Sequence, residues 1–421
     1  MKVTLAYGKN GLALEVPPAD EGRVAILRSK PVPALADVPR AIDAALRAPI
    51  GAPPLESVAR GRRSAVVVIS DITRPVPNRT LLPPILETIE RAGVPRAAIT
   101  ILVATGIHRA NEGEELVALV GPDIPARYRV VNHVARDPKE LVVAGTTRAG
   151  IPVHVNRHYV AADLKVLTGF IEPHLWAGYS GGVKAILPGI TGIETMKHMH
   201  GYAMIADPRT RYGLVEGNPF REAGLEVAAM VGVDFIVNVT LNETKAVTGV
   251  FAGHHKDAFL AGVKFLEPSV IARVNEPVDL AITSGGGEPL DRSLYQTIKG
   301  MSGVAGILKP TGRMIVASAC GEGAGSPEFT RLMDGVGEIE SFLARLRSPG
   351  FFEVDQWAAQ EIYSIAKRFP VGLKSEGLAP EAVRRYHLRP VESVQAELDA
   401  ALARGERVAI VPDGPYTMAA T

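Results

Sequence analysis

The stretch "SAVVVISDITRPVPN", residues 64–78, decides the fold class of this chain. Its apolar part, residues 65–69, is rich in β-branched side chains and lacks the alternation of a half-exposed strand. Such a strand is buried on both faces, as in a parallel sheet that helices cover. The run stops at Asp71, and Pro75 and Pro77 stiffen the turn that follows. Polar side chains should therefore leave this strand at its carboxyl end.

The same pattern recurs along the whole chain. Five more apolar runs end at polar or glycine residues: "AITILVATGIH" (98–108), "DLKVLTGFIEPH" (163–174), "DLAITSGGGE" (279–288), "RMIVASACGEG" (313–323) and "RVAIVPDG" (407–414). Amphipathic segments such as "RTLLPPILETIERAGV" (79–94) supply covering helices. We predict an α/β fold in both halves of the chain.

The length of 421 residues is too great for one ordinary core, so two domains are expected. The stretch "FLEPSVIARVNEPVDLAITSGG", residues 265–286, indicates the boundary, because a helical segment ends, two prolines follow and a new apolar strand begins. We predict a catalytic and cofactor-binding domain over residues 1–270. An α/β domain over residues 271–421 should contribute substrate-binding residues. Each domain should hold a mostly parallel sheet covered by helices, with the active site in the interdomain cleft.

Composition narrows the class of protein. The formal net charge of +1 argues against a nucleic-acid-binding surface, which usually shows a clear basic excess. The single cysteine, Cys320, excludes an internal disulfide framework and a metal cage made only of thiolates. The N-terminal stretch lacks the apolar core of a signal peptide, and no apolar run approaches the roughly 20 residues that span a bilayer. We therefore expect a cytoplasmic enzyme or binding protein.

Reactive side chains follow the predicted strands at their carboxyl ends, where α/β sheets bind ligands. Asp71 and Arg74 follow the first strand, and they form either a local ion pair that stiffens a loop or a site where the guanidinium holds a carboxylate or phosphate. His108 follows the second strand. A lone histidine is more often structural than catalytic, but this place at the sheet edge favours proton transfer.

The stretch "HLWAGYSGGVKAILPGI", residues 174–190, joins a histidine, a glycine turn and a lysine. Ser180 is expected to cap a short helix that starts at Gly181 and Gly182, leaving backbone N–H groups for an anion. The spacing is not that of a Walker loop. Lys184 has neighbours that look buried, and such a lysine tends to be nucleophilic, as in Schiff-base chemistry.

Two later stretches carry further candidates. In "ETMKHMHGY" (194–202), His198 and His200 are two residues apart, so on a helix they face different directions and suit a single-histidine ligand. In "DRSLYQTIKG" (291–300), Gln296 and Lys299 share one helix face. That face either reaches a ligand from the second domain or is an ordinary exposed surface.

Taken in order, these stretches resemble the nickel-dependent lactate racemase family. The matching pieces lie between residues 70 and 300: "SDITRPVPN", "TGIHR", "HLWAGYSGGVKAILPGI", "ETMKHMH" and "SLYQTIKG". The glycine–lysine piece and the "TRP" piece are the specific ones. The chain departs from the family at Met199, because an asparagine usually stands next to the nickel histidine.

The resemblance implies a nickel-pincer nucleotide cofactor, pyridinium-3-thioamide-5-thiocarboxylic acid mononucleotide, joined to Lys184 through a thioamide. His200 would be the protein ligand of nickel, beside one carbon and two sulfurs of the pincer, a donor set that suits square-planar nickel. The turn Ser180-Gly181-Gly182 would cradle part of the cofactor, and Asp71 would orient neighbours or balance charge.

The resemblance further implies the reaction. His108 and His174 would be an acid/base pair for a small 2-hydroxy acid whose Cα hydride moves to the cofactor and returns to the other face. Arg74, Gln296 and Lys299 would position the substrate, and Tyr295 and Trp357 would shape its pocket. The enzyme would be an isomerase, a racemase or epimerase, that depends on cofactor-making proteins and binds neither nucleic acid nor membrane. Homo-oligomer formation stays open.

Two other functions stay open at this point. A lysine Schiff-base enzyme of the pyridoxal-phosphate or aldolase type would also use Lys184, and it would need no nickel. A non-catalytic protein that binds an anionic metabolite would keep its affinity when His108 and His174 are replaced.

Overall fold

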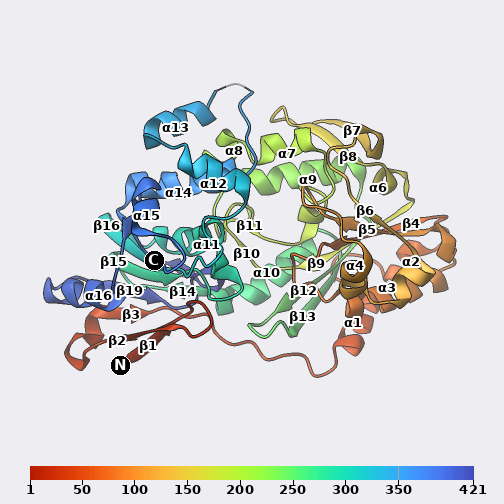
Figure 1. The fold of residues 1–421 in the computed structure, drawn as a ribbon. Helices are drawn as coiled ribbons and strands as arrows, with labels where there is room; N and C mark the ends of the chain where they lie inside the picture. The colour runs from red at the N-terminus through yellow and green to blue at the C-terminus, as the bar shows by residue number, and fades with distance from the viewer. Residues whose placement is uncertain (349) are drawn as a thin grey trace. The chain divides into compact units, whose positions relative to one another are not determined.

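The computed structural model describes residues 1–348 and 350–421 (Figure 1). The chain forms two compact units, and neither is a continuous segment. Unit 1 comprises Met1–Lys30, His200–Pro208 and Pro268–Thr421, and unit 2 comprises Pro31–Met199 and Arg209–Glu267. The predicted domains, residues 1–270 and 271–421, differ from these units chiefly in residues 1–30 and 200–208, which belong with the C-terminal part of the chain.

Unit 2 is built on a six-stranded sheet. Its order is β13 (Val247–Gly253), β12 (Phe235–Leu241), β9 (Leu164–Phe170), β4 (Ala65–Ser70), β5 (Ile99–Ala104) and β6 (Arg129–Asn132). All neighbouring pairs are parallel except β12 and β13. The predicted α/β fold with a mostly parallel sheet is confirmed here.

The β-branched run at residues 65–69 lies in β4, in the middle of this sheet. Residues 66–69 are fully buried, and Val67 is in register with Ile101 of β5 and Val166 of β9. Helix α3 (Asn78–Arg91) packs its apolar face against this sheet within one hydrophobic core. The other helices of the unit are α1 (Val38–Arg47), α2 (Leu55–Ala59), α4 (Gly113–Val120), α5 (Asp123–Arg127), α6 (Arg157–Ala161), α7 (Ile193–Met199), α9 (Pro219–Val231) and most of α10 (Asp257–Val270).

The strand order gives this sheet a topological switch point at β4. Strand β5 follows β4 in sequence and lies on one side of it. Strand β9, which comes later in the sequence, lies on the other side of β4. The connection that follows β4 leads to β5 on one side, whereas the connection that follows β9 leads to β12 on the other, so in such sheets the ligand crevice opens between the carboxyl ends of β4 and β9. Asp71 is the first residue beyond the end of β4.

Two small hairpins complete unit 2. Strands β7 (Leu141–Thr146) and β8 (Pro152–Asn156) form one, and β10 (Pro173–His174) and β11 (Gly178–Tyr179) form the other. The second hairpin comes directly after β9, so it carries His174 to the carboxyl edge of the sheet.

Unit 1 holds a second six-stranded sheet, which is parallel throughout. Its order is β18 (Arg389–Pro390), β17 (Val371–Lys374), β16 (Leu308–Ala317), β15 (Val278–Ser284), β19 (Val408–Val411) and β3 (Val24–Ile26). Its helices are α8 (Tyr202–Ala206), α11 (Leu294–Ala305), α12 (Pro327–Asp334), α13 (Ile339–Leu346), α14 (Gln356–Arg368), α15 (Pro380–Arg385) and α16 (Val394–Ala403).

The N-terminal segment explains why residues 1–30 belong to unit 1. In Figure 1 the red strand β3 lies beside the blue strand β19, and Val24 is in register with Val408. The hairpin of β1 (Lys2–Leu5) and β2 (Leu12–Glu15) packs into the same hydrophobic core. Strand β14 (Ile271–Arg273) pairs with β20 (Met418–Ala420).

Among the described residues, no helix is both long enough and apolar enough to cross a membrane.

Candidate active site

Three neighbouring strands of unit 2 deliver the candidate residues to one edge of the sheet. Strands β9, β4 and β5 are adjacent and parallel, and they end at Phe170, Ser70 and Ala104. Shortly beyond these ends lie His174, Asp71 and His108. A carboxylate and two imidazoles therefore follow three adjacent strands at the carboxyl edge of the sheet.

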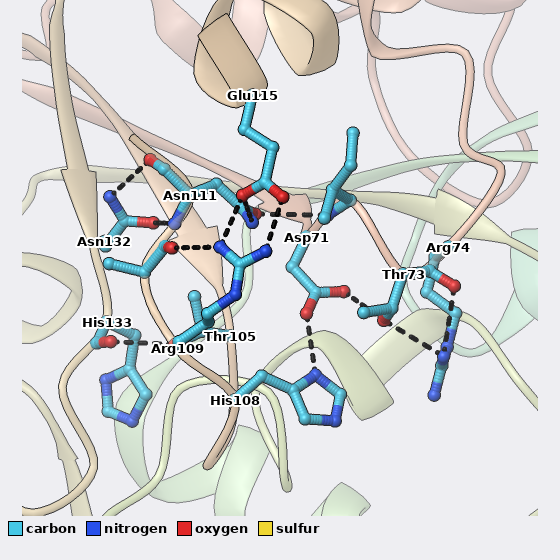
Figure 2. Close-up of polar contacts among 12 residues, drawn as sticks. Asp71, Thr73, Arg74, Thr105, His108, Arg109, Asn111, Glu115, Asn132 and His133 are labelled. Carbon is cyan, nitrogen blue, oxygen red and sulfur yellow. Dashed lines mark hydrogen bonds and ion pairs between the residues drawn. The ribbon is translucent and has the colours of Figure 1, made fainter. Parts of the chain in front are cut away.

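Asp71 and His108 form a direct pair. His108 Nδ1 lies 2.7 Å from Asp71 Oδ2, and Thr73 donates its hydroxyl to Asp71 Oδ1 at 2.6 Å (Figure 2). Because the carboxylate accepts, Nδ1 carries the proton, and a neutral His108 ring has its lone pair on Nε2. The Asp71 side chain is 5% exposed and that of His108 is 49% exposed. The carboxylate is thus buried behind a ring that reaches solvent.

The charge of Asp71 is held by its partners. Burial by itself would raise the pKa of this carboxyl group, but the hydrogen bonds from His108 and Thr73 outweigh burial, with smaller contributions from the charges of His108 and Arg74. The pKa of Asp71 is therefore lowered from its ordinary value. Asp71 is a carboxylate that holds the proton on one chosen nitrogen of His108.

Arg74 does not form the local ion pair that the sequence left open. Within the described chain, its guanidinium donates only to Thr73, with Nη1 lying 3.2 Å from the hydroxyl and 3.3 Å from the carbonyl oxygen. Only its backbone N–H contacts Asp71, at the carbonyl oxygen. Arg74 is half-buried as a residue, and its guanidinium keeps further N–H groups for an anion. In contrast, the neighbouring Arg109 forms a two-bonded pair with Glu115 and holds the loop (Figure 2).

His174 has the opposite surroundings from His108. Its Nδ1 lies 3.2 Å from the backbone nitrogen of Trp176 and 3.1 Å from that of Ala177, and both N–H groups donate to it. Nδ1 is therefore an acceptor, and a neutral ring carries its proton on Nε2. The ring also contacts the aromatic rings of Trp176 and Phe220. The tight turn of hairpin β10–β11 fixes this tautomer.

Lys184 lies in the 3-10 helix η4 (Gly182–Ala185). Its predicted buried surroundings are confirmed, because Val183, Ile186 and Leu187 are each at most 1% exposed. The Lys184 side chain itself is half-buried. The segment after Lys184 is tied to the His108 loop, since Gly106 N–H donates to the Gly189 carbonyl oxygen at 3.0 Å.

The expectation that Ser180 caps a helix is wrong. Gly181 holds the position before η4, at a φ of 91° that favours glycine, so the helix begins one residue later than expected. No side chain caps η4. The Gly182 N–H is not free for an anion either, because it donates to Asn238 Oδ1 at 2.7 Å. Within the described chain, the buried Ser180 hydroxyl has no partner.

Sequence reasoning missed two buried residues beside this glycine turn. Asn238 lies in β12, where one amide among apolar neighbours in "FIVNVTL" is a signal that could have found it. Arg221 lies in the first turn of α9, where the sequence "NPFREAG" looks like an ordinary exposed helix start. Its Nη1 donates to the Gly181 carbonyl oxygen at 3.0 Å.

Unit 1 holds the remaining candidates. His200 follows the last residue of α7 and is 8% exposed, whereas His198 on that helix is exposed. The His200 ring lies edge-to-face with Trp357, at 4.8 Å between centroids. Trp357 in turn donates its indole N–H to the Tyr295 hydroxyl at 2.9 Å. These three rings form one connected aromatic group within unit 1.

Gln296 and Lys299 both lie on α11, as the spacing predicted. Each side chain is half-buried. The Gln296 Oε1 atom is buried and has no hydrogen-bond partner among the described residues. A buried amide oxygen without a donor suits a ligand that brings one.

A metal site made of protein side chains alone is not present in the described part of the chain. No three His, Cys, Asp or Glu side chains among these residues lie close enough together to hold an ion. Any nickel bound here would need most of its ligands from another molecule, with a residue such as His200 supplying one.

Comparisons with known proteins give consistent matches. Residues 7–213 match the family model of the lactate racemase N-terminal domain, and residues 274–418 match that of the C-terminal domain. The chain is 34% identical to a lactate racemase of Thermoanaerobacterium thermosaccharolyticum over 420 residues, 98% of this chain and 97% of that protein. It is also 34% identical to a lactate racemase of Lactiplantibacillus plantarum, over 89% of each chain.

A solved structure agrees with this pattern. The lactate racemase apoprotein from Thermoanaerobacterium thermosaccharolyticum superposes with a TM-score of 0.92 at 32% identity, and the match covers 100% of both chains.

Proposed function

The chain belongs to the lactate racemase family and is an isomerase, and from this premise we propose that it interconverts the stereoisomers of lactate or a related small 2-hydroxy acid. One observation supports the proposal: Asp71 and His108 pair beyond the ends of β4 and β5, and His174 follows the adjacent strand β9, at the edge where such sheets bind ligands. Racemisation at a carbon that bears a hydroxyl group needs a group that removes the hydroxyl proton and one that returns it.

We propose that His108 is the group that removes the proton. Its Nε2 carries the lone pair because Asp71 holds the proton on Nδ1. When Nε2 accepts a proton, the ring becomes a cation 2.7 Å from a buried carboxylate, which stabilises it. Half of the His108 side chain is exposed, so a substrate can reach this nitrogen.

We propose that His174 acts on the substrate oxygen as a hydrogen-bond donor. A neutral ring offers Nε2–H, since Nδ1 accepts from Trp176 and Ala177. To deliver a whole proton, the ring must first gain one at Nδ1, where two N–H groups now donate. Those bonds would have to break first. Once the resulting cation had given its Nε2 proton to the substrate, His174 would carry its remaining proton on Nδ1, as a neutral His108 does. The two histidines can therefore exchange roles only through a rearrangement of hairpin β10–β11.

The residues around Lys184 fit the cofactor that the family resemblance implies. Close to the glycine turn before Lys184, the buried atoms Ser180 Oγ, Asn238 Nδ2 and Arg221 Nε have no hydrogen-bond partner within the described chain. We propose that Lys184 carries a nickel-pincer pyridinium mononucleotide and that the buried His200 is the protein ligand of nickel. When bound, this group supplies the acceptor and donor of the substrate's Cα hydride.

We propose that Arg74 binds the substrate carboxylate. Its guanidinium is paired with no acidic side chain in the described chain, and a carboxylate suits its planar donor set. Gln296, Lys299, Tyr295 and Trp357 are assigned to substrate binding by the resemblance. A cytoplasmic location and dependence on cofactor-making proteins stay predictions.

The test is to co-express the chain with cofactor-making proteins and to supply D- and L-isomers of several 2-hydroxy acids. We expect one nickel per chain, a mass increment on the Lys184 peptide, and interconversion that retains deuterium placed at Cα. Washout of that deuterium into solvent would contradict hydride transfer. Borohydride trapping of a carbonyl substrate on Lys184, without nickel, would instead support a lysine Schiff-base enzyme.

A further inference from the structure

Asn111 is a buried asparagine in the loop that carries His108. This loop connects β5 to α4, and Asn111 follows His108 by three residues. Its neighbours in the stretch "HRANEGEE", residues 108–115, are mostly charged, yet Asn111 is only 2% exposed. A buried amide group needs hydrogen-bond partners inside the protein, because it has given up those that water would provide. The partners of Asn111 therefore indicate what its side chain holds in place.

The side chain of Asn111 joins the His108 loop to the Asp71 loop. Its Oδ1 atom accepts from the backbone N–H of Ile72, the residue after Asp71, at 3.1 Å. Its Nδ2 atom donates to Glu115 Oε2 at 3.1 Å (Figure 2). These two partners fix the orientation of the amide group, because an N–H needs an acceptor and a carboxylate needs a donor. The peptide bond that follows Asp71 is thus held against the loop that presents His108.

The backbone of Asn111 is fixed by Asn132, the last residue of β6. Asn132 Oδ1 accepts from the Asn111 N–H at 2.9 Å, and Asn132 Nδ2 donates to the Asn111 carbonyl oxygen at 3.0 Å (Figure 2). Two hydrogen bonds between one amide side chain and the backbone of one residue set both its position and its orientation. Asn111 therefore links the carboxyl ends of three neighbouring strands, β4, β5 and β6.

The hydrogen bond between His108 and Asp71 spans the same two loops. His108 Nδ1 lies 2.7 Å from Asp71 Oδ2, and such a bond weakens steeply when its distance or angle changes. Half of the His108 side chain is exposed, so packing alone does not hold the ring in place. Within the described chain, the Asn111 side chain forms no hydrogen bond with either the Asp71 or the His108 side chain. Any effect of Asn111 on this pair therefore passes through the loops.

We propose that Asn111 is a positioning residue for proton transfer by His108. By holding the Ile72 N–H, it keeps the Asp71 carboxylate within hydrogen-bond reach of His108 Nδ1, and so keeps the lone pair of His108 on Nε2. This inference rests on the proposed function, in which that lone pair removes the hydroxyl proton of the substrate. Asn111 is not itself a catalytic residue, because it acts through Asp71 and His108.

The first experiment requires neither cofactor nor substrate. The full chain is labelled with nitrogen-15 in its histidines, and the ring nitrogens are observed by NMR about two pH units above the ordinary histidine pKa of about 6.5. The His108→Gln variant identifies the His108 signals. In wild type, we expect the His108 proton on Nδ1. In Asn111→Ala, the fraction of His108 with its proton on Nε2 should rise, because the ring spends less time at the Asp71 carboxylate.

Two further variants show which hydrogen bond matters. Asn111→Asp keeps an oxygen for the Ile72 N–H but replaces the NH2 donor with a second carboxylate oxygen beside Glu115. Because the like charges repel each other, its His108 signals should lie between those of wild type and Asn111→Ala. The matched control is Asn242→Ala. The Oδ1 atom of Asn242 also accepts from backbone N–H groups, in the turn between β12 and β13, which carries none of the candidate residues. This control should leave the His108 signals and kcat unchanged.

Kinetics of the cofactor-loaded enzyme separate positioning from general loosening of the fold. We expect Asn111→Ala to lower kcat by about 10²-fold, because a catalytic group displaced by about 1 Å can lose that much rate. KM should change by less than about threefold, since the proposed substrate-binding groups are untouched. Asn111→Asp should lower kcat by about tenfold. In an Asp71→Asn background, Asn111→Ala should lower kcat by less than about threefold, because the pair that it positions is already lost.

Three outcomes would overturn the inference. Unchanged His108 signals in a folded Asn111→Ala variant would show that Asn111 only stabilises its loop. An equal loss of kcat from Asn111→Ala in the wild-type and Asp71→Asn backgrounds would show that it acts on another group. Similar effects of Asn242→Ala would mean that loosening any loop of this unit produces them. Thermal unfolding checks that each variant folds. Should Asn111→Ala fail to fold, wild-type signals and kcat in Asn111→Asp would overturn the inference instead.

These outcomes are distinct from failure of the proposed function. If the loaded wild-type enzyme interconverts no 2-hydroxy acid, the proposed function fails, but the histidine signals still show whether Asn111 positions the pair of Asp71 and His108. If interconversion proceeds and the signals do not respond to Asn111→Ala, the positioning role alone fails.

Discussion

The end of β5 and the hairpin β10–β11 each present one histidine at the same edge of the unit 2 sheet, but in opposite protonation patterns. His108 Nδ1 faces the carboxylate of Asp71, whereas His174 Nδ1 faces two backbone N–H groups. In the neutral state, His108 therefore offers a lone pair at Nε2, whereas His174 offers an N–H donor there. The difference teaches that the neighbours of a histidine, more than its position at a strand end, determine whether its Nε2 accepts or donates.

Replacing His108, the proposed base, should have the largest effect on kcat. We expect His108→Ala to lower kcat by about 10⁴-fold, the upper end for a general acid–base group. Nickel content and the Lys184 mass increment of the purified variant should match wild type. A variant that loses both activity and nickel would show that His108 serves cofactor loading rather than proton transfer.

Giving His108 the tautomer of His174 should have the next largest effect on kcat. In Asp71→Asn, the amide NH2 can donate to His108 Nδ1, which would move the ring proton to Nε2 and copy the His174 arrangement. We expect kcat to fall by about 10³-fold with a smaller change in KM, because the wrong tautomer cannot accept a proton. Nitrogen NMR of labelled histidine would detect the tautomer directly. An unchanged tautomer with full activity would contradict the role of Asp71.

Substitution of His174 should lower kcat less than substitution of His108. Glutamine offers an N–H donor but cannot exchange protons, so His174→Gln should keep more activity than His108→Gln. We expect about a 10²-fold loss in kcat for His174→Gln in the direction in which His108 removes the proton. Initial rates from each isomer, measured separately, test this. Equal losses in both variants and both directions would mean that the two histidines act as equivalent acid–base groups.

A third histidine of the unit is the control, with the smallest effect on activity. His133 is buried. Its Nε2 donates to the Thr191 carbonyl oxygen, and its Nδ1 accepts from the Asn156 side chain. Burial lowers its pKa to about 4. We expect His133→Gln to keep kcat within about twofold, because the residue touches no candidate group and only its packing changes.

The same variant should change the pH dependence of stability. The folded pKa of His133 lies below the unfolded value of about 6.5, so between these values the unfolded chain binds more protons. The free energy of unfolding should therefore fall as pH drops from about 6.5 to about 4, by about 3 kcal/mol from this group. Denaturant titrations should show a shallower fall in His133→Gln. Identical slopes would mean that His133 titrates in the folded protein as it does in the unfolded chain.

Much of the fold was accessible from local patterns. The β-branched runs at residues 65–69 and 164–170 predict buried parallel strands, and the polar residues after them predict a ligand edge, because both depend only on neighbours in sequence. The pairing of Val24 with Val408 was not accessible, since no local pattern links segments almost a whole chain apart. This pairing is why residues 1–30 belong to unit 1.

The candidate site was accessible only in part, for a related reason. Asp71 and His108 closely follow strands β4 and β5, so their place at the edge of the sheet was predicted. The tautomer of His174 depends on two backbone N–H groups that only the turn geometry aims at it. Arg221 looks exposed in sequence, and only the three-dimensional packing against Phe259 buries it. The prediction that Ser180 caps the helix failed because Gly181, at a φ of 91°, holds the position before η4, so the helix begins at Gly182.

The discontinuous make-up of unit 1 has a consequence for the order in which the protein matures during synthesis. Strand β3 is made long before β19, the strand that pairs with it, because β19 begins only at Val408. Until β19 has been made, β3 has no sheet to join. The segments of unit 2 end at Glu267, so all of them are made before most of unit 1. The unit that carries Lys184 can therefore fold first, and the unit that carries His200 must wait for β19.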